Sequence, residues 1–352
     1  MKIDNIFNLD PYSIKSKEKE KIFIEVLNDL HIHHKKNSPE YKSIIKKIYT
    51  NKGTSSYLNS FPFLPVRLFK EIELKSIKND EIFRVLNSSG TGGTPSKIYL
   101  DKNNSKNQIK ALTKIASSFL GTKRMPMLII DKNNISSSKS TFSAREAGVS
   151  GFSIFGSTIK YALNDDMTLN YDSINNFIEN YKNQKVLIYG FTSVIWEYLI
   201  ERIDKKKLSK LDNTILLHGG GWKKLASKNI TNQIFKKKLT EEFGINQIIN
   251  YYGMVEQTGS IFFECEKGFF HTSNFSDIII RDKDFNICKK NQRGLIQLIS
   301  LLPTSYPGNS IITEDIGEFI GEDTCECKRL GKYFIVHGRI EEAETRGCSD
   351  AH

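Results

Sequence analysis

Short apolar runs alternate with helix-like stretches through the middle of the chain, and this alternation limits the possible folds more than any other feature. The apolar runs are of strand length, and the stretches between them repeat apolar residues at helical spacing. The expected strands cover residues 127–130, 186–189, 215–218 and 248–251, and the expected helices cover 104–120, 171–181, 194–203 and 228–243. Strands that alternate with helices are typical of a layered α/β domain. We therefore expect an α/β fold.

The two ends of the chain have a different pattern. Residues 16–50 repeat apolar positions at helical spacing, which predicts helices near the N-terminus. Beyond residue 260 strand-like pieces dominate, at 260–264, 277–281, 294–300, 317–321 and 333–336. We expect an α/β domain with a helical N-terminal segment at 1–275, a smaller β-rich subdomain at 276–338, and a hinge with a flexible tail at 339–352.

Charge and hydropathy argue against two classes of partner. The net charge is +11, but the lysines are spread along the chain and form no basic tail or stripe, so we expect no nucleic-acid binding. The longest apolar runs, at 125–130 and 298–302, are too short to span a bilayer. No apolar segment follows the first residues, so no secretory signal is visible. We expect a cytoplasmic protein without a membrane span.

The five cysteines are irregularly spaced, and in a cytoplasmic protein we expect them to be reduced. Cys325 and Cys327 resemble half of a metal clamp. Zinc sites usually place two or more residues between paired ligands and need a second pair, so we expect a surface turn between strands instead. Three histidines in the N-terminal helical segment could also bind a metal, but we expect them to be surface residues: His31, His33 and His34.

Residues 88–97 form a loop that is rich in glycine and hydroxyl residues. Glycine N–H groups and hydroxyls can surround an anion, and a lysine adds a positive charge. The loop is not a P-loop, because Pro95 and the lysine are misplaced, and it lacks the third glycine of a dinucleotide fingerprint. A flexible surface loop is the alternative to phosphate binding. The candidate phosphate-binding residues are Ser89, Gly90, Thr91, Gly92, Thr94 and Lys97.

A glycine-rich turn follows the strand-like run at 215–218, and it contains Gly219, Gly220 and Gly221. In an α/β sheet, ligands bind at the carboxyl ends of strands, and three glycines there would let a flat ligand approach the backbone. The alternative is a tight strand-to-helix turn, which needs only one glycine.

A second motif follows the run at 248–251, and it contains Tyr252, Gly253, Glu256 and Thr258. Tyrosine offers a ring face on which a purine can stack, and glutamate offers a hard oxygen ligand for Mg²⁺. Taken alone, the string is more typical of an ordinary strand-to-loop turn.

The order of these motifs, followed by Asp315 and by Gly338 with Arg339, resembles the acyl-adenylate-forming superfamily, which includes acyl-CoA synthetases, luciferases and adenylation domains. The resemblance implies that residues 88–97 are the phosphate loop, that Tyr252 to Glu256 is the aromatic-Gly-x-Thr-Glu box, and that Asp315 binds ribose. It also implies ATP as a substrate and Mg²⁺ as a cofactor. Val255 departs from the pattern, because the superfamily usually has a threonine there.

A second departure from the superfamily pattern points to a narrower family. The superfamily continues past its hinge into a mobile C-terminal domain with a catalytic lysine, whereas thirteen residues follow Arg339 in this sequence. The segments 63–70 and 252–259 and the ending Arg346-Gly347-Cys348 together resemble the acyl-protein synthetase of the bacterial bioluminescence fatty acid reductase complex. That resemblance implies an AMP-forming ligase that adenylates a carboxylic acid, with a fatty acid as the expected substrate, and moves the acyl group to Cys348. A partner acyl reductase would then receive it, within a possible hetero-oligomer.

The position of Cys348 fits such a role. It lies nine residues after Arg339, and at about 3.3 Å per extended residue its thiol could reach over roughly 30 Å. The alternative is an ordinary cysteine in a frayed tail. Two other functions stay open. One is an acyl- or aryl-CoA ligase that releases a free thioester, and the other is a non-catalytic subunit of a reductase complex. The sequence does not identify the acid.

Overall fold

The computed structural model describes residues 3–50, 53–88, 94–133, 141–204, 213–220, 222, 225, 228–257 and 259–340, with only the backbone of 141 and 142. The chain forms two compact units. Among the described residues, the first unit combines 3–119 with 252–340, and the second contains 120–251. The division predicted from the sequence, with boundaries after residues 275 and 338, differs from this one and stays a prediction.

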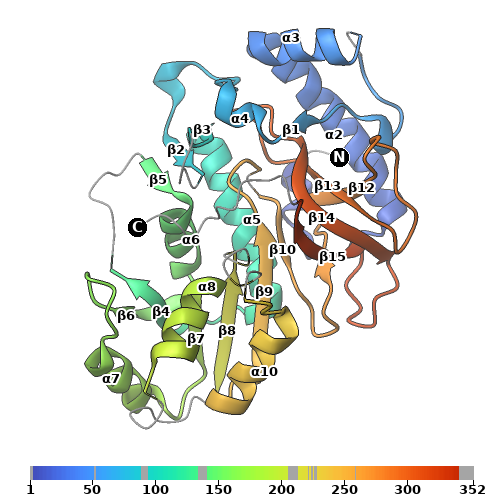
Figure 1. Cartoon of the computed structure of the whole chain (residues 1–352). Coiled ribbons are helices and arrows are strands. Elements are labelled where there is room, and N and C mark those ends of the chain that lie inside the picture. The colour runs from blue at the N-terminus through green and yellow to red at the C-terminus, as the bar shows by residue number, and fades with distance from the viewer. Residues whose placement is uncertain are drawn as a thin grey trace. The chain divides into compact units, whose positions relative to one another are not determined.

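The second unit contains a parallel sheet with the strand order β9-β8-β7-β4-β6 (Figure 1). The strands of this unit are β4 (Met125–Lys132), β5 (Thr141–Ser143), β6 (Gly156–Leu163), β7 (Val186–Phe191), β8 (Thr214–Gly219) and β9 (Gln247–Gly253). Every residue of β7 and of β8 is buried. Strands of a parallel sheet that are covered on both faces read as continuous apolar runs, which is why the sequence predicts them well.

Helices connect these strands, and their ends follow from local sequence signals. They are α6 (Ala144–Ser153), α7 (Tyr171–Tyr181), α8 (Thr192–Val194) with the π-helical segment Ile195–Arg202, and α10 (Asn232–Phe243). Thr231 caps the start of α10 by accepting a hydrogen bond from the N–H of Ile234 at 3.3 Å. Gly244 ends it with a positive φ of 75°, a conformation that glycine adopts without strain.

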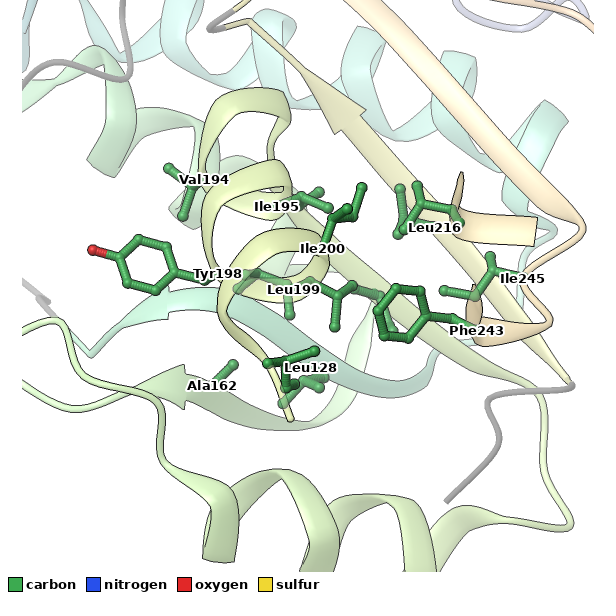
Figure 2. Packing of buried hydrophobic residues seen from close by; sticks show 14 of the residues in the cluster. Leu128, Ala162, Val194, Ile195, Tyr198, Leu199, Ile200, Leu216, Phe243 and Ile245 are labelled. Carbon is green, nitrogen blue, oxygen red and sulfur yellow. The ribbon is translucent and has the colours of Figure 1, made fainter. Parts of the chain in front are cut away.

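The core of the second unit lies between one face of the sheet and three helical segments. Side chains of α7, of the π-helical segment and of α10 pack there against strand residues such as Leu128, Ile188 and Leu216. Figure 2 shows part of this core, including Leu199, Phe243 and Leu216. Successive residues of a strand point to opposite faces. Tyr189 therefore lies on the other face of β7, where Phe152 of α6 packs against it at 4.9 Å between ring centroids.

The first unit contains a mostly antiparallel sheet with the order β11-β15-β14-β13-β12, and a short strand, β1, pairs in parallel with β14. A hairpin of two strands, β2 and β3, belongs to the same unit. The strands are β1 (Leu64–Pro65), β2 (Arg84–Asn87), β3 (Lys97–Leu100), β10 (Ile261–Phe263), β11 (Phe270–His271), β12 (Ser276–Arg281), β13 (Arg293–Ser300), β14 (Ser310–Glu322) and β15 (Lys332–Arg339).

The N-terminal segment supplies most helices of this unit. They are α1 (Ile3–Ile6), α2 (Ser16–Asn37), α3 (Pro39–Ile48), α4 (Leu68–Glu71) and α5 (Lys102–Leu120), with single 3₁₀ turns at Leu58–Ser60 and Asn79–Glu81. Ser38 caps α3 and Pro39 occupies its first turn, where a missing N–H costs nothing. Helix α2 buries Ile22, Phe23 and Leu27, as its apolar spacing predicts.

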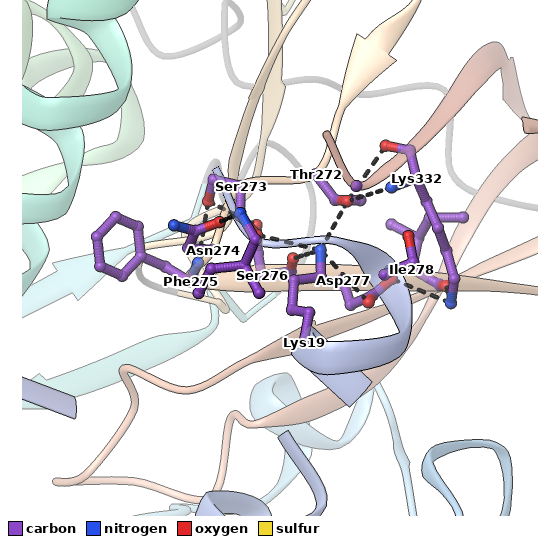
Figure 3. Close-up of polar contacts among 12 residues, drawn as sticks. Lys19, Thr272, Ser273, Asn274, Phe275, Ser276, Asp277, Ile278 and Lys332 are labelled. Carbon is purple, nitrogen blue, oxygen red and sulfur yellow. Dashed lines mark hydrogen bonds and ion pairs between the residues drawn. The ribbon is translucent and has the colours of Figure 1, made fainter. Parts of the chain in front are cut away.

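A cluster of buried polar residues around Lys19 and Asp277, called the polar junction below, joins α2 to β12 (Figure 3). The ammonium group of Lys19 donates to Thr272 Oγ1 at 2.8 Å and to the carbonyl oxygen of Ser276 at 3.0 Å, and it lies 3.4 Å from Asp277 Oδ2. Lys332 contacts the other oxygen of Asp277 at 3.1 Å. Burial alone would raise the pKa of Asp277, but the two ammonium groups hold it below its ordinary value. The aspartate is therefore ionised within the fold.

The α/β class and all of the predicted strands and helices are confirmed, although β14 is one strand of 13 residues rather than a piece that begins at Gly317. The prediction that the three histidines are surface residues is wrong for two of them. His31 and His34 are buried, and their ring nitrogens contact Tyr41 Oη at 2.8 Å and Asn309 Oδ1 at 2.7 Å. Among the described residues, no helix has the length and apolar character needed to cross a membrane.

Candidate active site

Three of the expected site residues lie together in the first unit. Tyr252 stands near the end of β9, Asp315 lies within β14, and Arg339 ends β15 directly opposite Asp315 in the strand register. The hydroxyl of Tyr252 donates to Asp315 Oδ2 at 2.7 Å, and Arg339 Nε donates to Asp315 Oδ1 at 3.2 Å. The antiparallel pairing of β14 and β15 thus brings the two charged residues together, although 24 positions separate them in the sequence.

The surroundings fix the chemical state of this group. Burial, with a further contribution from the Asp315 carboxylate, raises the pKa of Tyr252 well above its ordinary value. The phenol therefore stays protonated and acts as a donor. Each carboxylate oxygen of Asp315 has two lone pairs, so it can accept bonds from ligand hydroxyls in addition to those from Tyr252 and Arg339. A ribose diol is a ligand of that kind.

Aromatic rings surround one part of Tyr252. Its ring centroid lies 6.0 Å from that of Phe262 and 6.2 Å from that of Phe270, and Phe334 meets it edge-on at 6.4 Å. The side chain as a whole is half-buried. Stacking of adenine on Tyr252 stays a prediction. Phe262, in contrast, is fully buried in the core.

The sequence did not single out Glu314 as a site residue, but the structure places it beside the same group. Its carboxylate pairs with Arg67 Nε and lies 3.9 Å from Arg339 Nη1. Arg67 belongs to the segment 63–70, and β1 in that segment runs parallel to β14 with Leu64 opposite Ile311. In the sequence, the sign of this contact is that Glu314 is a carboxylate next to Asp315. Its partners, Arg67 and Arg339, can be identified only from the strand pairing.

Glu256 lies in the turn after β9 and is 7% exposed. In the described part of the chain, no hydrogen bond or ion pair reaches its carboxylate, whereas its neighbour Gln257 donates to the carbonyl oxygens of Leu298 at 3.0 Å and Gly308 at 2.9 Å. Gln257 thus anchors the turn. A carboxylate on a largely buried residue, with no partner among the described residues, is suited to binding a cation. Gly253 is exposed, and Thr258 lies outside the described residues.

The candidate phosphate loop connects β2 and β3. The N–H of Ser88 donates to the carbonyl oxygen of Ser96 at 3.0 Å, and the N–H of Ser96 donates to Ser88 Oγ at 2.9 Å. These bonds close the base of the loop. Thr94 and Lys97, on the C-terminal side of the loop, are exposed. Four of the other predicted residues lie outside the described residues, namely Ser89, Gly90, Thr91 and Gly92.

The glycine turn after β8 belongs to the second unit, and the structure explains why two of its positions are occupied by glycine. A Cβ on Gly219 would lie 2.6 Å from the carbonyl oxygen of Tyr251, and Gly220 has a positive φ of 66°. Gly221 lies outside the described residues. Close packing and a turn therefore account for the first two glycines without a ligand.

Polar residues of the second unit that the sequence did not reveal lie at the ends of its strands. His218 Nδ1 and Thr192 Oγ1 are 2.9 Å apart, and burial lowers the pKa of this histidine well below its ordinary value, so the ring is neutral. Asp131 and Arg145 form a buried pair with two contacts, at 2.7 Å and 2.6 Å. No motif marks these pairs, because their partners are set by strand order rather than by spacing.

The turn between strands expected at Cys325 and Cys327 is confirmed, but the expectation that it lies at the surface is wrong for Cys325. They do lie in the connection between β14 and β15, but Cys325 is buried, and Cys265 and His271 lie beside the two cysteines. Cys265 and His271 are six positions apart in the sequence, and they are the second pair of possible ligands that the sequence did not reveal. Cys348, the predicted acyl acceptor, lies outside the described residues.

The fold is that of adenylate-forming enzymes. A solved structure of 2-hydroxyisobutyryl-CoA ligase, in the postadenylation state with R3-HIB-AMP, matches 94% of this chain and 69% of its own with a TM-score of 0.68 and 14% identity. An open conformation of that ligase, with 2-HIB-AMP and CoA, matches 94% of this chain and 77% of its own with a TM-score of 0.69 and 14% identity.

A model of the acyl-protein synthetase family LuxE matches residues 1–352. The chain therefore belongs to the LuxE acyl-protein synthetase family, which confirms the resemblance seen in the sequence. It is also similar to a long-chain-fatty-acid–luciferin-component ligase from Photorhabdus luminescens. The two are 29% identical over 99 residues, which are 28% of this chain and 84% of that protein.

Proposed function

We propose that this protein activates a carboxylic acid with ATP and then transfers the acyl group to its own Cys348. The observation that carries the proposal is the family match along the whole chain. The contacts among Tyr252, Asp315 and Arg339 support it, because these residues match separate motifs of the adenylate-forming superfamily and meet in one place.

The proposed reaction has two steps. First, a carboxylate oxygen of the acid attacks the α-phosphorus of ATP, which forms an acyl-adenylate and releases pyrophosphate. The thiolate of Cys348 then attacks the acyl carbon, so that a thioester forms and AMP leaves. A partner acyl reductase would receive the acyl group from this thioester, in a complex with this protein, in the cytoplasm. The relative from Photorhabdus luminescens makes a long-chain fatty acid the first substrate to test.

Each residue of the candidate site has a proposed part in the first step. Asp315 and Arg339 bind the ribose, Tyr252 packs against adenine, and the loop at 88–97, with Thr94 and Lys97, binds phosphate. Glu256 would hold Mg²⁺, which offsets the phosphate charge when bound. Its buried carboxylate, without a partner in the described part of the chain, fits such an ion.

Cys348→Ser tests the second step. The variant should keep the pyrophosphate release that depends on added acid, and it should lose the acyl mass that hydroxylamine removes from the protein. Cys288→Ser is the matched control, because Cys288 is a buried cysteine of the first unit and should not affect either reading. A Cys348→Ser protein that still becomes acylated, or peptide mapping of the acyl group to another cysteine, would defeat the self-loading step but not the adenylation step.

Release of a free CoA thioester is the second candidate function, and the similarity to a ligase solved with CoA favours testing it. Incubation of the wild-type protein with ATP, the acid and CoA should separate the two. An acyl-CoA product with no acyl mass on the protein would favour the CoA ligase. No pyrophosphate release with any acid would favour a non-catalytic subunit.

A further inference from the structure

Four potential metal ligands converge in the first unit, away from the residues proposed to bind ATP. They are the sulfur atoms of three cysteines and a ring nitrogen of one histidine, and all four atoms lie within 4.8 Å of one another: Cys265, His271, Cys325 and Cys327. Cys265 and Cys325 are 3% and 8% exposed, His271 is fully buried, and Cys327 is half-buried. The group is thus enclosed on most sides and open to solvent near one ligand.

The distances fit one tetrahedral ion. Zn–S bonds of about 2.3 Å and Zn–N bonds of about 2.0–2.1 Å place ligand atoms about 3.5–3.8 Å apart in a tetrahedron. The sulfur atoms of Cys265 and Cys325 are 4.0 Å apart, and Cys327 Sγ is 3.3 Å from His271 Nε2. A disulfide would need a separation of about 2.05 Å, so the first pair is not bonded.

Two similar turns carry the cysteines. The N–H of Gly268 donates to the carbonyl oxygen of Cys265 at 2.9 Å, and the N–H of Lys328 donates to that of Cys325 at the same distance. Both turns end in a positive φ, 82° at Gly268 and 67° at Lys328. In the first turn, the N–H of Lys267 also points to Cys265 Sγ at 3.4 Å. Donors of this kind favour a thiolate, the form in which cysteine binds a metal.

The imidazole of His271 is held in place by its neighbours. Its ring is nearly parallel to that of Tyr333, with 5.7 Å between centroids, and Tyr12 meets it edge-on at 6.3 Å. Nε2 faces the cysteines, whereas Nδ1 makes no hydrogen bond within the described residues. Ring packing therefore sets the orientation that presents Nε2 to the group.

The charge around the group also suits a metal. Three thiolates and one divalent ion leave a net charge of −1, and the guanidinium of Arg329, which interacts electrostatically with Cys327, can offset it. Arg329 is fixed by stacking on Phe119, at 3.9 Å from the ring centroid, and by a 3.2 Å contact with Glu266.

We propose that Cys265, His271, Cys325 and Cys327 bind one structural Zn²⁺ ion. Four protein ligands complete a tetrahedron and leave no position for a substrate, which is the pattern of structural rather than catalytic zinc sites. Three soft thiolates and one imidazole favour zinc over the hard cations that accompany ATP. The ion would tie β11 and the turn before it to the connection between β14 and β15, the two strands that carry Asp315 and Arg339. This inference does not depend on the proposed reaction.

Metal analysis of the untagged wild-type protein, purified under reducing conditions, is the first test. We expect about one zinc per chain, since a four-ligand site holds a single ion. Cys265→Ser and Cys327→Ser should each lose the zinc, whereas Cys288→Ser, a buried cysteine outside the group, should retain it. A tight chelator should lower the melting temperature of the wild-type protein and leave that of zinc-free Cys327→Ser unchanged.

Cobalt replacement tests the geometry without any variant. After removal of zinc, titration with Co²⁺ should give the visible absorption of tetrahedral thiolate-bound cobalt, and the signal should saturate at about one equivalent. A wild-type protein without bound metal, whose stability does not respond to chelator and which gives no such absorption, would overturn the proposal. So would a disulfide between Cys265 and Cys325 in the freshly purified protein, because its sulfur atoms could not bind the ion.

Discussion

In the second unit, three helical segments bury apolar side chains against a parallel sheet, whereas in the first unit a lysine and an aspartate lie buried between a helix and an antiparallel sheet (Figures 2 and 3). Lys19 and Asp277 are 1% and 2% exposed, which is within the range of the leucines of the second core. Apolar burial is non-directional, so its loss scales with the volume removed. A buried charge depends on particular partners, so the loss of one partner leaves a penalty of its own.

The largest expected effect is that of Lys19→Met, which breaks the polar junction. It removes three hydrogen bonds and one ion pair and leaves Asp277 with Lys332 as its remaining cation. Removal of one partner of a buried pair typically lowers the free energy of unfolding by about 3–5 kcal/mol. Urea unfolding followed by circular dichroism, with hydrogen exchange of α2, should show the loss.

Lys17→Met is the matched control, because Lys17 lies on the same helix and is exposed. It should change the free energy of unfolding by less than about 0.5 kcal/mol. The double variant Lys19→Met, Asp277→Leu should recover part of the lost stability, since no fully buried charge is then left unpaired. Lys332 also loses Asp277 in this variant, but its side chain is partly exposed. If Lys19→Met alone is as stable as wild type, the polar junction does not stabilise the first unit. The contrast drawn between the two units would then be wrong for the first unit.

Leu216→Ala is the counterpart in the second unit. Leu216 is fully buried in β8, so its truncation should lower the free energy of unfolding by about 2–5 kcal/mol. Both tryptophans of the chain, Trp196 and Trp222, belong to this unit, so their fluorescence follows its unfolding. Ile188→Val, which removes one methylene from the same core, should cost only about 0.5–1.5 kcal/mol. Equal losses for the two variants would mean that volume does not set stability there.

The same contrast explains how far the sequence could predict the fold. Strands β7 and β8 of the second unit are predictable because every residue of both is buried and each reads as an apolar run, as in Val186–Phe191. Strand β6, which has exposed residues along its middle, was not predicted from the sequence. Strand β14 is harder, because Gly317 interrupts it and polar residues alternate with apolar ones, so that only its second half stands out. Its first half, with Asp315, is recognisable as a strand only from its pairing with β13 and β15.

The side-chain contacts of the first unit were likewise predictable only in part. Motif order predicted Tyr252, Asp315 and Arg339 as members of one site, and the structure places them in contact. The partners of Lys19 are more than 250 positions away, and those of Cys325 include Cys265, at 60 positions. No local spacing encodes such contacts, since they arise when separate strands and turns pack together. His34, bonded to Ser76 and Asn309, was misjudged as a surface residue for the same reason.

Asp315→Asn tests whether every polar contact of the first unit stabilises the fold or whether that of Asp315 serves ATP binding. If Asp315 binds ribose, the variant should raise the KM for ATP about tenfold to a hundredfold and leave the KM for the acid nearly unchanged. One hydrogen bond to a charged group is worth about 1.5–3 kcal/mol, which sets this range. Acid-dependent pyrophosphate exchange at varied ATP concentration measures it.

Tyr252→Phe is the control for this prediction, because it removes the hydroxyl that bonds Asp315 and keeps the ring. It should affect ATP binding less than Asp315→Asn does. An Asp315→Asn protein with normal ATP dependence and lowered stability would give Asp315 the same structural role as Asp277, as an anchor for Tyr252 and Arg339.

The smallest expected effect is that of Lys228→Met, which breaks an ion pair on the surface of the second unit. Lys228 Nζ lies 2.9 Å from Glu201 Oε1, a shorter distance than the 3.4 Å between Lys19 and Asp277, but its side chain is 51% exposed. Water and salt screen such a pair, so we expect a loss of about 0.2–1 kcal/mol that fades at high ionic strength. Tryptophan fluorescence during urea unfolding at low and high salt measures it. A loss as large as that of Lys19→Met, or one insensitive to salt, would mean that distance rather than burial governs these pairs, and the contrast between the two units would then need another cause.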